Sequence, residues 1–360
     1  MSKVRCAVIG AGSWGTMAHV PALMDHPEAE LVAVQHRDRV IAERIAKDFG
    51  VPQACTTAEE VLTIDDLDAV VISSIPALHC EQAKAALQRD CHVLIEKPMT
   101  ITAREAEELV ALADAKQLHF IIGATWHYTP HCIEARRIVQ SGRLGQLRMI
   151  SILMTNICQG LYRGESYAEV IAETDDVSGR PEHQPPYLEP GRTSYSDPQL
   201  AGGGQIYCQA SHPAAYISFL TERQPAEVFA HFENDDAQVD VYDAVNCKLD
   251  DGTLVSLATN GAATAKKMHY ELRIFGTEGI LAQELWQGTL EISDRKGKVQ
   301  EYDSLPADQI YPMFAPATNL VNTVLGKEEN GSPARHGAFA MKLTEAACES
   351  SRTGANVKLS

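Results

Sequence analysis

The sequence predicts an α/β protein with an N-terminal doubly wound parallel sheet and a C-terminal α/β domain built on a large, mainly antiparallel open sheet. Three observations support this fold class. An apolar strand, Cys6–Ile9, runs directly into the glycine-rich turn GAGSWG at positions 10–15. Short apolar strands then alternate with amphipathic helices up to about residue 125. Beyond that point the strands become longer and alternate apolar with polar residues.

The first half contains the pattern expected of a parallel sheet. We predict strands at Cys6–Ile9, Leu31–Val34, Ala69–Ser73, Val93–Ile95 and Phe120–Ile122, and helices near Trp14–Met24, Val40–Phe49, His79–Arg89 and Ala103–Lys116. Ligands of such sheets bind at the carboxyl ends of the strands, so the residues that follow each strand are the candidates for a site.

The glycine turn is the strongest of these candidates. In a GxGxxG turn between a strand and a helix, Gly10 permits the tight turn, Gly12 lets backbone amides reach a pyrophosphate, and Gly15 lets the helix lie close to the strand. The first amides of the helix and its dipole also favour a phosphate group. The turn therefore predicts dinucleotide binding.

The second half reads as a sheet with a few helices. We predict strands at Met149–Met154, Ala226–Glu233, Val239–Leu249, Thr253–Asn260, His269–Phe275 and Ile280–Glu284, with helices near Pro130–Ser141, Ala315–Leu325 and Gly337–Arg352. The turn Asp250-Asp251-Gly252 predicts a hairpin. The stretch from Thr155 to Ala201 lacks periodicity and is too long for a simple connector, so we expect a lid or an oligomer contact.

Length and composition limit the possible functions. At 360 residues the chain exceeds what one core usually organises, so we predict two domains, 1–125 and 126–360. A net charge of −17 disfavours nucleic acid and anionic membranes as partners. The N-terminus has no apolar leader and no stretch reaches the length of a membrane span, so we expect a cytoplasmic protein. Nine scattered cysteines without a CxxC pair indicate reduced thiols and no metal site.

Two further constellations carry reactive side chains. The strand Val93–Ile95 ends in Glu96-Lys97-Pro98, where a partly desolvated lysine is suited to proton transfer. A surface Glu-Lys pair before a helix-starting proline is the alternative. Farther along, a helix from about Gly203 would place Gln205, Cys208, Gln209 and His212 on one face. The alternative there is a core histidine satisfied by an amide.

Taken together, these motifs resemble the glucose–fructose oxidoreductase / inositol dehydrogenase / rhizopine-catabolism (Gfo/Idh/MocA) family. The resemblance rests on the glycine turn, Pro76-Ala77-Leu78-His79, Glu96-Lys97-Pro98, the segment from Gly123 to Pro130, and the Gly-Gly-Gly…His212 stretch. It implies a Rossmann domain, 1–125, that binds NAD(P), and a substrate-binding and oligomerisation domain, 126–360, whose open sheet builds homodimers or homotetramers. It also implies that Lys97 and His212 are catalytic.

The resemblance also implies the other site residues. Cofactor contacts are expected from Gly10, Gly12, Ser13, Trp14, Gly15, His36, Arg37, Ser74, His79, Glu96 and Lys97, and substrate contacts from Trp126, His127, Tyr128, Gln205, Cys208, Gln209 and His212. Three features depart from the family's pattern, and two of them concern the substrate-binding residues. Family members commonly carry an Asp where this chain has Cys208, so proton transfer rests on Lys97 with His212, or on another group. The family's frequent Arg-Phe-x-Pro reads His127-Tyr128-Thr129-Pro130 here, where Trp126 and Tyr128 could stack on a pyranose or belong to the core.

The end of the second strand bears on the choice of cofactor. An acidic residue at position 36 would bond the ribose 2′-hydroxyl, whereas His36 with Arg37 suits a 2′-phosphate. Asp38 lies close enough to leave NAD open, so we expect a slight preference for NADP.

Three functions follow from the resemblance. The first is hydride transfer between nicotinamide and a secondary hydroxyl of a sugar, polyol or glycoside, with Lys97 taking the hydroxyl proton. The second is redox-neutral cleavage of a glycoside by oxidation, elimination and reduction. The third is a non-catalytic sugar or nucleotide sensor, against which the presence of Lys97 and His212 argues.

Overall fold

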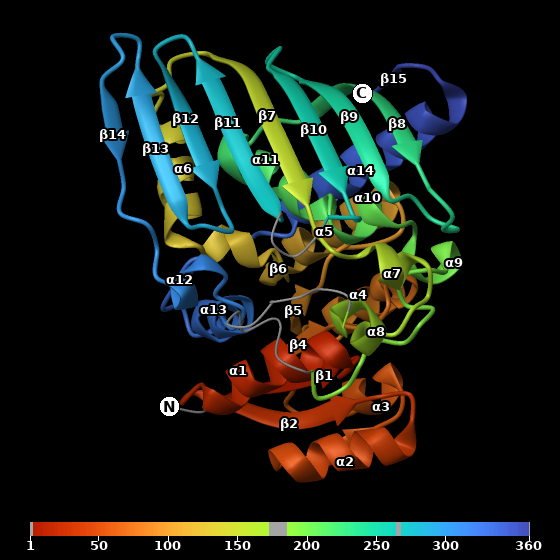
Figure 1. Ribbon diagram of the computed structural model, residues 1–360. Helices are drawn as coiled ribbons and strands as arrows, with labels where there is room; N and C mark the ends of the chain where they lie inside the picture. Colours follow the sequence, from red (N-terminus) through yellow and green to blue (C-terminus); the bar gives the residue numbers. More distant parts are fainter. Residues whose placement is uncertain (1–2, 173–185, 264–267, 360) are drawn as a thin grey trace. The chain divides into compact units, whose positions relative to one another are not determined.

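The computed structural model describes residues 3–172, 186–263 and 268–359, and the chain divides into two compact units (Figure 1). The first unit comprises Met1–Thr125 with the segments Pro185–Gly191 and Met313–Ala338. The second comprises Trp126–Gln184, Arg192–Pro312 and Phe339–Ser360. The two later segments of the first unit differ from the sequence-based division, which assigned both of them to the second domain.

The first unit is built on a six-stranded parallel sheet in the order β3-β2-β1-β4-β5-β6. Its strands are β1 (Val4–Ile9), β2 (Ala29–Gln35), β3 (Gln53–Cys55), β4 (Ala69–Ile72), β5 (His92–Ile95) and β6 (Phe120–Ile122). Its helices are a π-helical turn (Gly15–His19), α1 (Val20–Asp25), α2 (Arg39–Phe49), α3 (Ala58–Leu62), α4 (Pro76–Gln88), α5 (Ala103–Lys116) and α13 (Ala315–Val324). This strand order reverses between β1 and β4, where dinucleotides bind in doubly wound sheets.

Local sequence explains where these helices begin and end. The Asp38 side chain accepts hydrogen bonds from the amides of Val40 and Ile41 and so caps α2, which ends at Gly50 in the left-handed region. Thr102 and Glu105 form a reciprocal capping box at the start of α5. The predicted parallel sheet is confirmed. Of the six strands of this sheet, the short edge strand β3 was the one not predicted.

The second unit is built on a nine-stranded sheet in the order β14-β13-β12-β11-β7-β10-β9-β8-β15. All of its pairings are antiparallel except that of β7 with β10, as the prediction of a mainly antiparallel sheet requires. The strands are β7 (Leu147–Thr155), β8 (Pro225–Glu233), β9 (Tyr242–Leu249), β10 (Leu254–Asn260), β11 (His269–Gly276), β12 (Gly279–Glu284), β13 (Thr289–Asp294), β14 (Val299–Glu301) and β15 (Val357–Lys358). The predicted hairpin at 250–252 joins β9 to β10.

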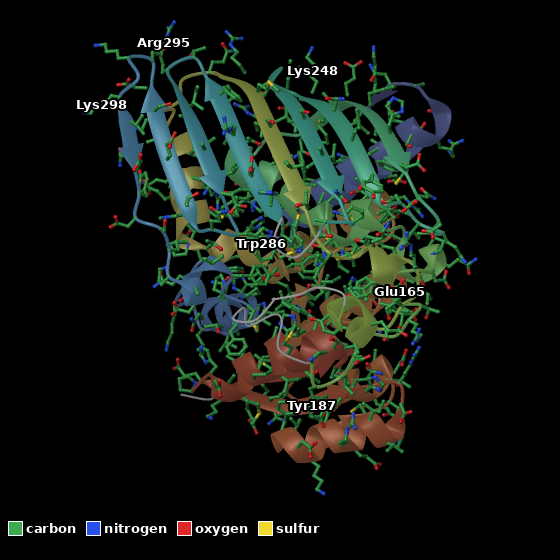
Figure 2. The ribbon with its side chains drawn as sticks, in the orientation of Figure 1. Glu165, Tyr187, Lys248, Trp286, Arg295 and Lys298 are labelled. Atoms are coloured by element: carbon green, nitrogen blue, oxygen red, sulfur yellow. The ribbon has the colours of Figure 1, made fainter. Side chains whose placement is uncertain are left out.

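Among the residues that the structure describes, helices cover one face of this sheet and none covers the other (Figure 1). The helices of the unit are a 3-10 turn (Thr125–Tyr128), α6 (Pro130–Gln140), α7 (Gln159–Tyr162), α8 (Tyr167–Ala172), α9 (Pro198–Ala201), α10 (Gln205–Cys208), α11 (Ser211–Thr221), α12 (Ala307–Ile310) and most of α14 (Arg335–Thr353). In β9 every second residue is buried, as expected of a sheet with one solvated face. Figure 2 shows Arg295 and Lys298 at one end of the sheet and Trp286 at the opposite end.

The stretch from Thr155 to Ala201 contains three short helices, α7, α8 and α9. Residues 173–185, on which much of the expected lid or oligomer contact falls, lie outside the described residues. Tyr187 follows them in a segment that belongs to the first unit, and it contacts α2 of that same unit. Its hydroxyl donates to Asp48 Oδ2 at 2.6 Å, and its ring packs edge-on against Phe49 and under the guanidinium of Arg44.

Candidate active site

The glycine turn has the geometry that a dinucleotide pyrophosphate requires. Gly10 has a φ of +79°, and a Cβ there would lie 2.4 Å from the amide nitrogen of Ser74, so only glycine fits between β1 and β4. A Cβ on Gly15 would lie 2.9 Å from the Gly10 carbonyl oxygen. At Gly12, by contrast, the nearest atom would be 4.0 Å away, so space is open there. Ser13 and Trp14 begin the following helix, whose N-terminal end favours an anionic group. These residues fit a bound pyrophosphate.

Gln35, at the end of β2, holds this turn in place and was not singled out from the sequence. Its side-chain oxygen accepts from the Gly10 amide at 2.9 Å, and its side-chain nitrogen donates to the Thr56 carbonyl at 2.8 Å. Its backbone carbonyl also accepts from the Ala11 amide. The Gln35 side chain is buried, so its amide satisfies two backbone groups that would otherwise lack partners.

The residues after β2 determine which charges lie near a cofactor ribose. His36 is half-buried, and its Nδ1 accepts from the Asp38 amide, while Arg37 is exposed. Burial lowers the pKa of His36 below its ordinary value, and the hydrogen bond from Asp38 only partly opposes this. Because Asp38 Oδ1 is the cap of α2, that oxygen is already engaged by two amides.

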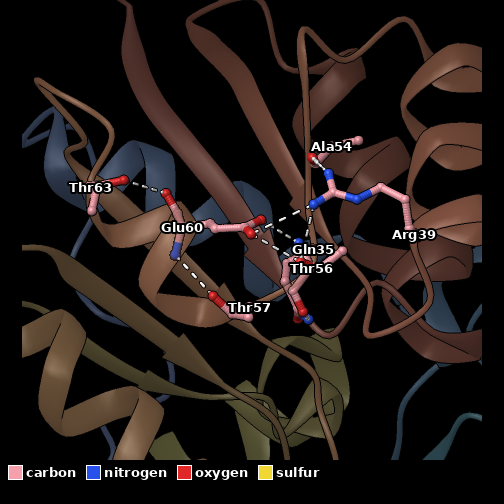
Figure 3. Close-up of polar contacts among 7 residues, drawn as sticks. All are labelled: Gln35, Arg39, Ala54, Thr56, Thr57, Glu60 and Thr63. Atoms are coloured by element: carbon pink, nitrogen blue, oxygen red, sulfur yellow. Dashed lines mark hydrogen bonds and ion pairs between the residues drawn. The ribbon is translucent and has the colours of Figure 1, made fainter.

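Near the end of β2, Arg39 and Glu60 are both hydrogen-bonded to Thr56 (Figure 3). Arg39 donates to the Ala54 carbonyl and to the Thr56 hydroxyl, and its guanidinium lies 3.6 Å from Glu60. Glu60 accepts from the amide and the hydroxyl of Thr56, which lowers the pKa of the Glu60 carboxyl. Arg37 therefore remains as the exposed guanidinium directly after β2.

His79 does not have the expected role. It is fully buried, and its two ring nitrogens contact the carbonyl oxygens of Pro98 at 2.9 Å and Ser74 at 3.0 Å. Since none of its surface is exposed, it is not placed to contact a cofactor. It instead connects the segment after β4 to the segment after β5. Ser74 is half-buried, and its hydroxyl bonds Gln82 at 2.6 Å.

Glu96 lies at the centre of a cluster at the end of β5. Its Oε1 accepts from the Trp14 indole nitrogen at 2.8 Å and contacts His19 Nε2 at 2.9 Å, and its Oε2 accepts from the Lys97 amide at 3.2 Å. Burial by itself would raise the pKa of this carboxyl, but the His19 hydrogen bond and the charges of His19 and Lys97 outweigh burial and lower it. Glu96 is therefore a buried carboxylate.

Lys97 follows this carboxylate directly. Its side chain is half-buried, and the bond between Lys97 and Pro98 is cis. The alternative of a simple surface ion pair does not describe this arrangement, because Glu96 is only 7% exposed and is directed to Trp14 and His19.

The helix expected from Gly203 is interrupted in the second unit. The structure has two helices, α10 and α11, with the break at Gln209 and Ala210. The break overturns the argument that placed four polar side chains on one helical face, because that argument assumed a constant 100° step. Asp240 contributes to the geometry before the break: its carboxylate accepts from the amides of Gly204 and Ile206, at 2.9 and 2.6 Å.

The predicted substrate residues of α10 and α11 differ in exposure. Gln205 is fully buried, and its oxygen accepts from the Tyr162 hydroxyl at 2.8 Å, so it packs inside the unit. Gln209 is half-buried, and its side-chain nitrogen lies 3.6 Å from both Cys208 Sγ and Cys158 Sγ. His212 is 6% exposed, at the start of α11. Gln209 is the most exposed of these side chains.

Two of the three residues at 126–128 belong to the core. Trp126 is 2% exposed and is surrounded by the rings of Tyr270, Trp286 and Tyr311. His127 is 1% exposed and stacks on Phe219, with the two ring centroids 4.2 Å apart. These contacts favour the core alternative over stacking on a sugar, since neither ring has an open face.

Tyr128 is half-buried. It therefore stays a candidate for substrate contact.

The sequence did not single out two polar residues of the first unit that contact the candidate site: His19, which contacts Glu96, and Gln35, which contacts the glycine turn. Gln35 could have been found as a polar residue ending a buried strand. His19 gave no comparable signal, because a lone histidine in an apolar helix reads as core. Within residues 3–172, 186–263 and 268–359, no three His, Cys, Asp or Glu side chains form a metal-binding group, and no helix there is long and apolar enough to cross a membrane.

Comparison with known families matches both halves of the chain. Residues 4–124 match the oxidoreductase family with an NAD-binding Rossmann fold, GFO_IDH_MocA. Residues 177–282 match the GFO/IDH/MocA C-terminal domain.

Individual relatives support the same grouping. A dTDP-3,4-didehydro-2,6-dideoxy-alpha-D-glucose 3-reductase of Streptomyces antibioticus is 36% identical over 154 residues, which cover 42% of this chain and 46% of the reductase. The chain thus spans less than half the length of several curated relatives that it matches. A D-xylose 1-dehydrogenase [NADP(+)] of Haloarcula marismortui is 24% identical over 99% of this chain and 94% of its own.

Among solved structures, an oxidoreductase domain protein from Kribbella flavida aligns over the full length of both chains, with a TM-score of 0.82 and 19% identity. A levoglucosan dehydrogenase in complex with NADH and L-sorbose aligns equally completely, with a TM-score of 0.80 and 16% identity. These likenesses establish the shared fold. With a matching profile for each half and the glycine turn and Glu96-Lys97-Pro98 in place, the chain belongs to the Gfo/Idh/MocA oxidoreductase family.

Proposed function

We propose that this protein is an NAD(P)-dependent oxidoreductase that acts on a secondary hydroxyl group of a sugar, polyol or glycoside. The observation that carries the proposal is the pairing, on one parallel sheet, of a dinucleotide turn after β1 with Lys97 next to the buried Glu96 carboxylate after β5. Relatives named as a sugar dehydrogenase and a sugar-nucleotide reductase support the substrate class.

The roles of the residues follow from their chemistry. A bound nicotinamide would supply the hydride acceptor for the alcohol carbon. Lys97 would take the proton of the hydroxyl group, since an amine that gives up its proton can act as a general base. His212 would orient that hydroxyl, and Gln209 would bond a neighbouring one, because an amide offers both donors and an acceptor.

For the cofactor we propose a modest preference for NADP over NAD. Arg37 is exposed after β2, whereas Arg39 is engaged with Ala54 and Thr56. Asp38 is the acidic residue that could bind the ribose hydroxyls of NAD. Its Oδ1 accepts from two helix amides and is therefore less available to a ribose hydroxyl. An exposed guanidinium favours a 2′-phosphate, although solvent screening limits the gain.

Lys97→Ala tests the proposal. We expect turnover to fall by about a hundredfold or more, because the proton acceptor is lost, while the dissociation constant for the nucleotide changes little. Wild type is first screened against sugars, inositols and glycosides with both nucleotides, following the absorbance of the reduced nicotinamide. Lys84→Ala, on the exposed face of α4, is the matched control.

Three results would contradict this assignment. Near-wild-type turnover of Lys97→Ala would remove the lysine from the mechanism. Product release without a change in absorbance would instead favour glycoside cleavage. Nucleotide binding without turnover of any member of the screen would favour a sensor.

A further inference from the structure

We propose that His19 is a positioning residue for Lys97, acting through the Glu96 carboxylate, and that the π-helical turn Gly15–His19 is the device that brings it there. This inference rests on the proposed function for the importance of Lys97. The contacts that carry it lie entirely within the first unit.

The first step is the convergence of two donors on one buried oxygen. The Trp14 indole and the His19 imidazole both reach Glu96 Oε1, at 2.8 and 2.9 Å, and their rings meet edge to face at 6.5 Å. A Cβ on Gly123 would lie 2.5 Å from the same oxygen, so backbone closes the remaining side. The carboxylate is thereby confined to one orientation.

The second step is the link from this carboxylate to the lysine. Glu96 Oε2 accepts from the backbone amide of Lys97 at 3.2 Å. Since Oε1 and Oε2 belong to one rigid group, donors that fix Oε1 also fix the acceptor of the Lys97 amide. Small displacements of a reacting group can cost about a hundredfold in rate, so such an anchor has kinetic consequences.

The third step explains the wide helical turn. In a regular α-helix, residues five apart are rotated by about 140° from one another, so Trp14 and His19 would face different directions. The Val20 amide instead bonds the Gly15 carbonyl, five residues back, which defines the π-helical turn. The turn widens the helix by one residue and lets positions 14 and 19 reach the same oxygen. Such turns occur frequently at functional sites.

His19 also carries a cost that a purely apolar core would avoid. It is fully buried, and its Nδ1 has no hydrogen-bond partner among the residues that the structure describes. An apolar side chain at this position would remove that cost. The contact of Nε2 with Glu96 gives the imidazole a role that an apolar side chain could not fill.

The test compares His19→Gln with His19→Asn. A glutamine amide nitrogen reaches about as far as Nε2 and keeps the donor to Glu96, whereas an asparagine amide is one carbon too short. The first readout is hydrogen exchange of the Lys97 amide in the free protein, resolved by overlapping peptides across Glu96–Met99; Pro98 contributes no amide. We expect exchange to be about tenfold faster in His19→Asn and close to wild type in His19→Gln.

The second readout is kinetic. We expect kcat to fall about tenfold in His19→Asn, with the KM for the substrate and the nucleotide dissociation constant nearly unchanged, and to recover within about threefold in His19→Gln. Met17→Ala, on the same turn but with a side chain that cannot donate a hydrogen bond to Glu96, is the control for loss of stability alone. In a Glu96→Gln background, His19→Asn should add little further loss, because the two residues act in series.

Unchanged Lys97 exchange and unchanged kcat in His19→Asn, with only a lowered Tm, would overturn the proposal and leave His19 as a core residue. Equal losses in the Gln and Asn variants would overturn it as well. Failure of the proposed function would be seen separately, because wild type would then turn over no sugar, polyol or glycoside. The exchange experiment would still test the role of His19, since it needs neither substrate nor nucleotide.

Discussion

At the scale of single residues, Arg37 and Asp38 show how two hydrogen bonds change the interpretation of a charged pair. Both follow β2, and in the sequence either could meet the cofactor ribose. The structure places Asp38 Oδ1 on the amides of Val40 and Ile41, where a carboxylate also benefits from the positive end of the helix dipole. The guanidinium of Arg37 remains exposed.

We therefore expect Arg37→Ala to raise the dissociation constant for NADP by several-fold and that for NAD by much less, because only NADP carries the 2′-phosphate. Calorimetric titration of both nucleotides measures the difference. The exposed Arg104→Ala, on α5, controls for the loss of one positive charge. Tight NAD binding with negligible NADP binding by wild type would show that Asp38 sets the preference.

The segment from Gly202 to α11 shows, at the scale of an element, how a distant residue shapes a helix. Asp240 holds Gly204 and Ile206 through its carboxylate, and its backbone carbonyl accepts from the Gln205 amide. A Cβ on Gly204 would lie 2.1 Å from that carbonyl oxygen. Gly204 is thus required because the Asp240 backbone approaches it closely. The hydrogen bonds from Gly204 and Ile206 to Asp240 hold the start of α10 in place.

Gly204→Ala should lower the free energy of unfolding by about 3 kcal/mol or more, because the contact is with backbone that cannot move aside cheaply. Denaturant unfolding measures this loss. Gly297→Ala is the comparison: it sits in an open turn with a φ of +76°, so it should lose only about 1 kcal/mol from left-handed strain. Similar losses in both variants would contradict the close-approach argument.

At the scale of the whole molecule, one face of the nine-stranded sheet is left uncovered by the helices that the structure describes. Cross-strand pairing places Leu254 beside Met149, Met149 beside Phe275, and Phe275 beside Ile280. Leu254, Met149 and Ile280 are each more than a third exposed. An apolar row across four strands is typical of a protein interface, and we propose that it joins copies of this chain into a homodimer or homotetramer.

Met149→Lys with Leu254→Lys should therefore shift the protein toward the monomer, because four-carbon ammonium side chains would be buried opposite one another. Sedimentation velocity over a range of concentrations measures the assembly. Lys substitution of Val40, an exposed apolar residue of α2, is the control. A wild-type protein that sediments as a monomer at all concentrations would contradict the proposal.

The sequence by itself determined the two kinds of sheet, the glycine turn and the position of Glu96-Lys97-Pro98, because each depends on local pattern: alternation, apolar runs, and residues that only a turn or strand end accommodates. The break between α10 and α11, the core packing of Trp126 and the enclosure of Glu96 by Trp14 and His19 could not be read from it. Each of these depends on partners far away in the chain, such as Asp240 for Gly204 and Glu96 for His19, which are 36 and 77 positions distant. Tertiary structure decided them, since hydrogen bonds and burial override local periodicity wherever a buried polar group needs a partner.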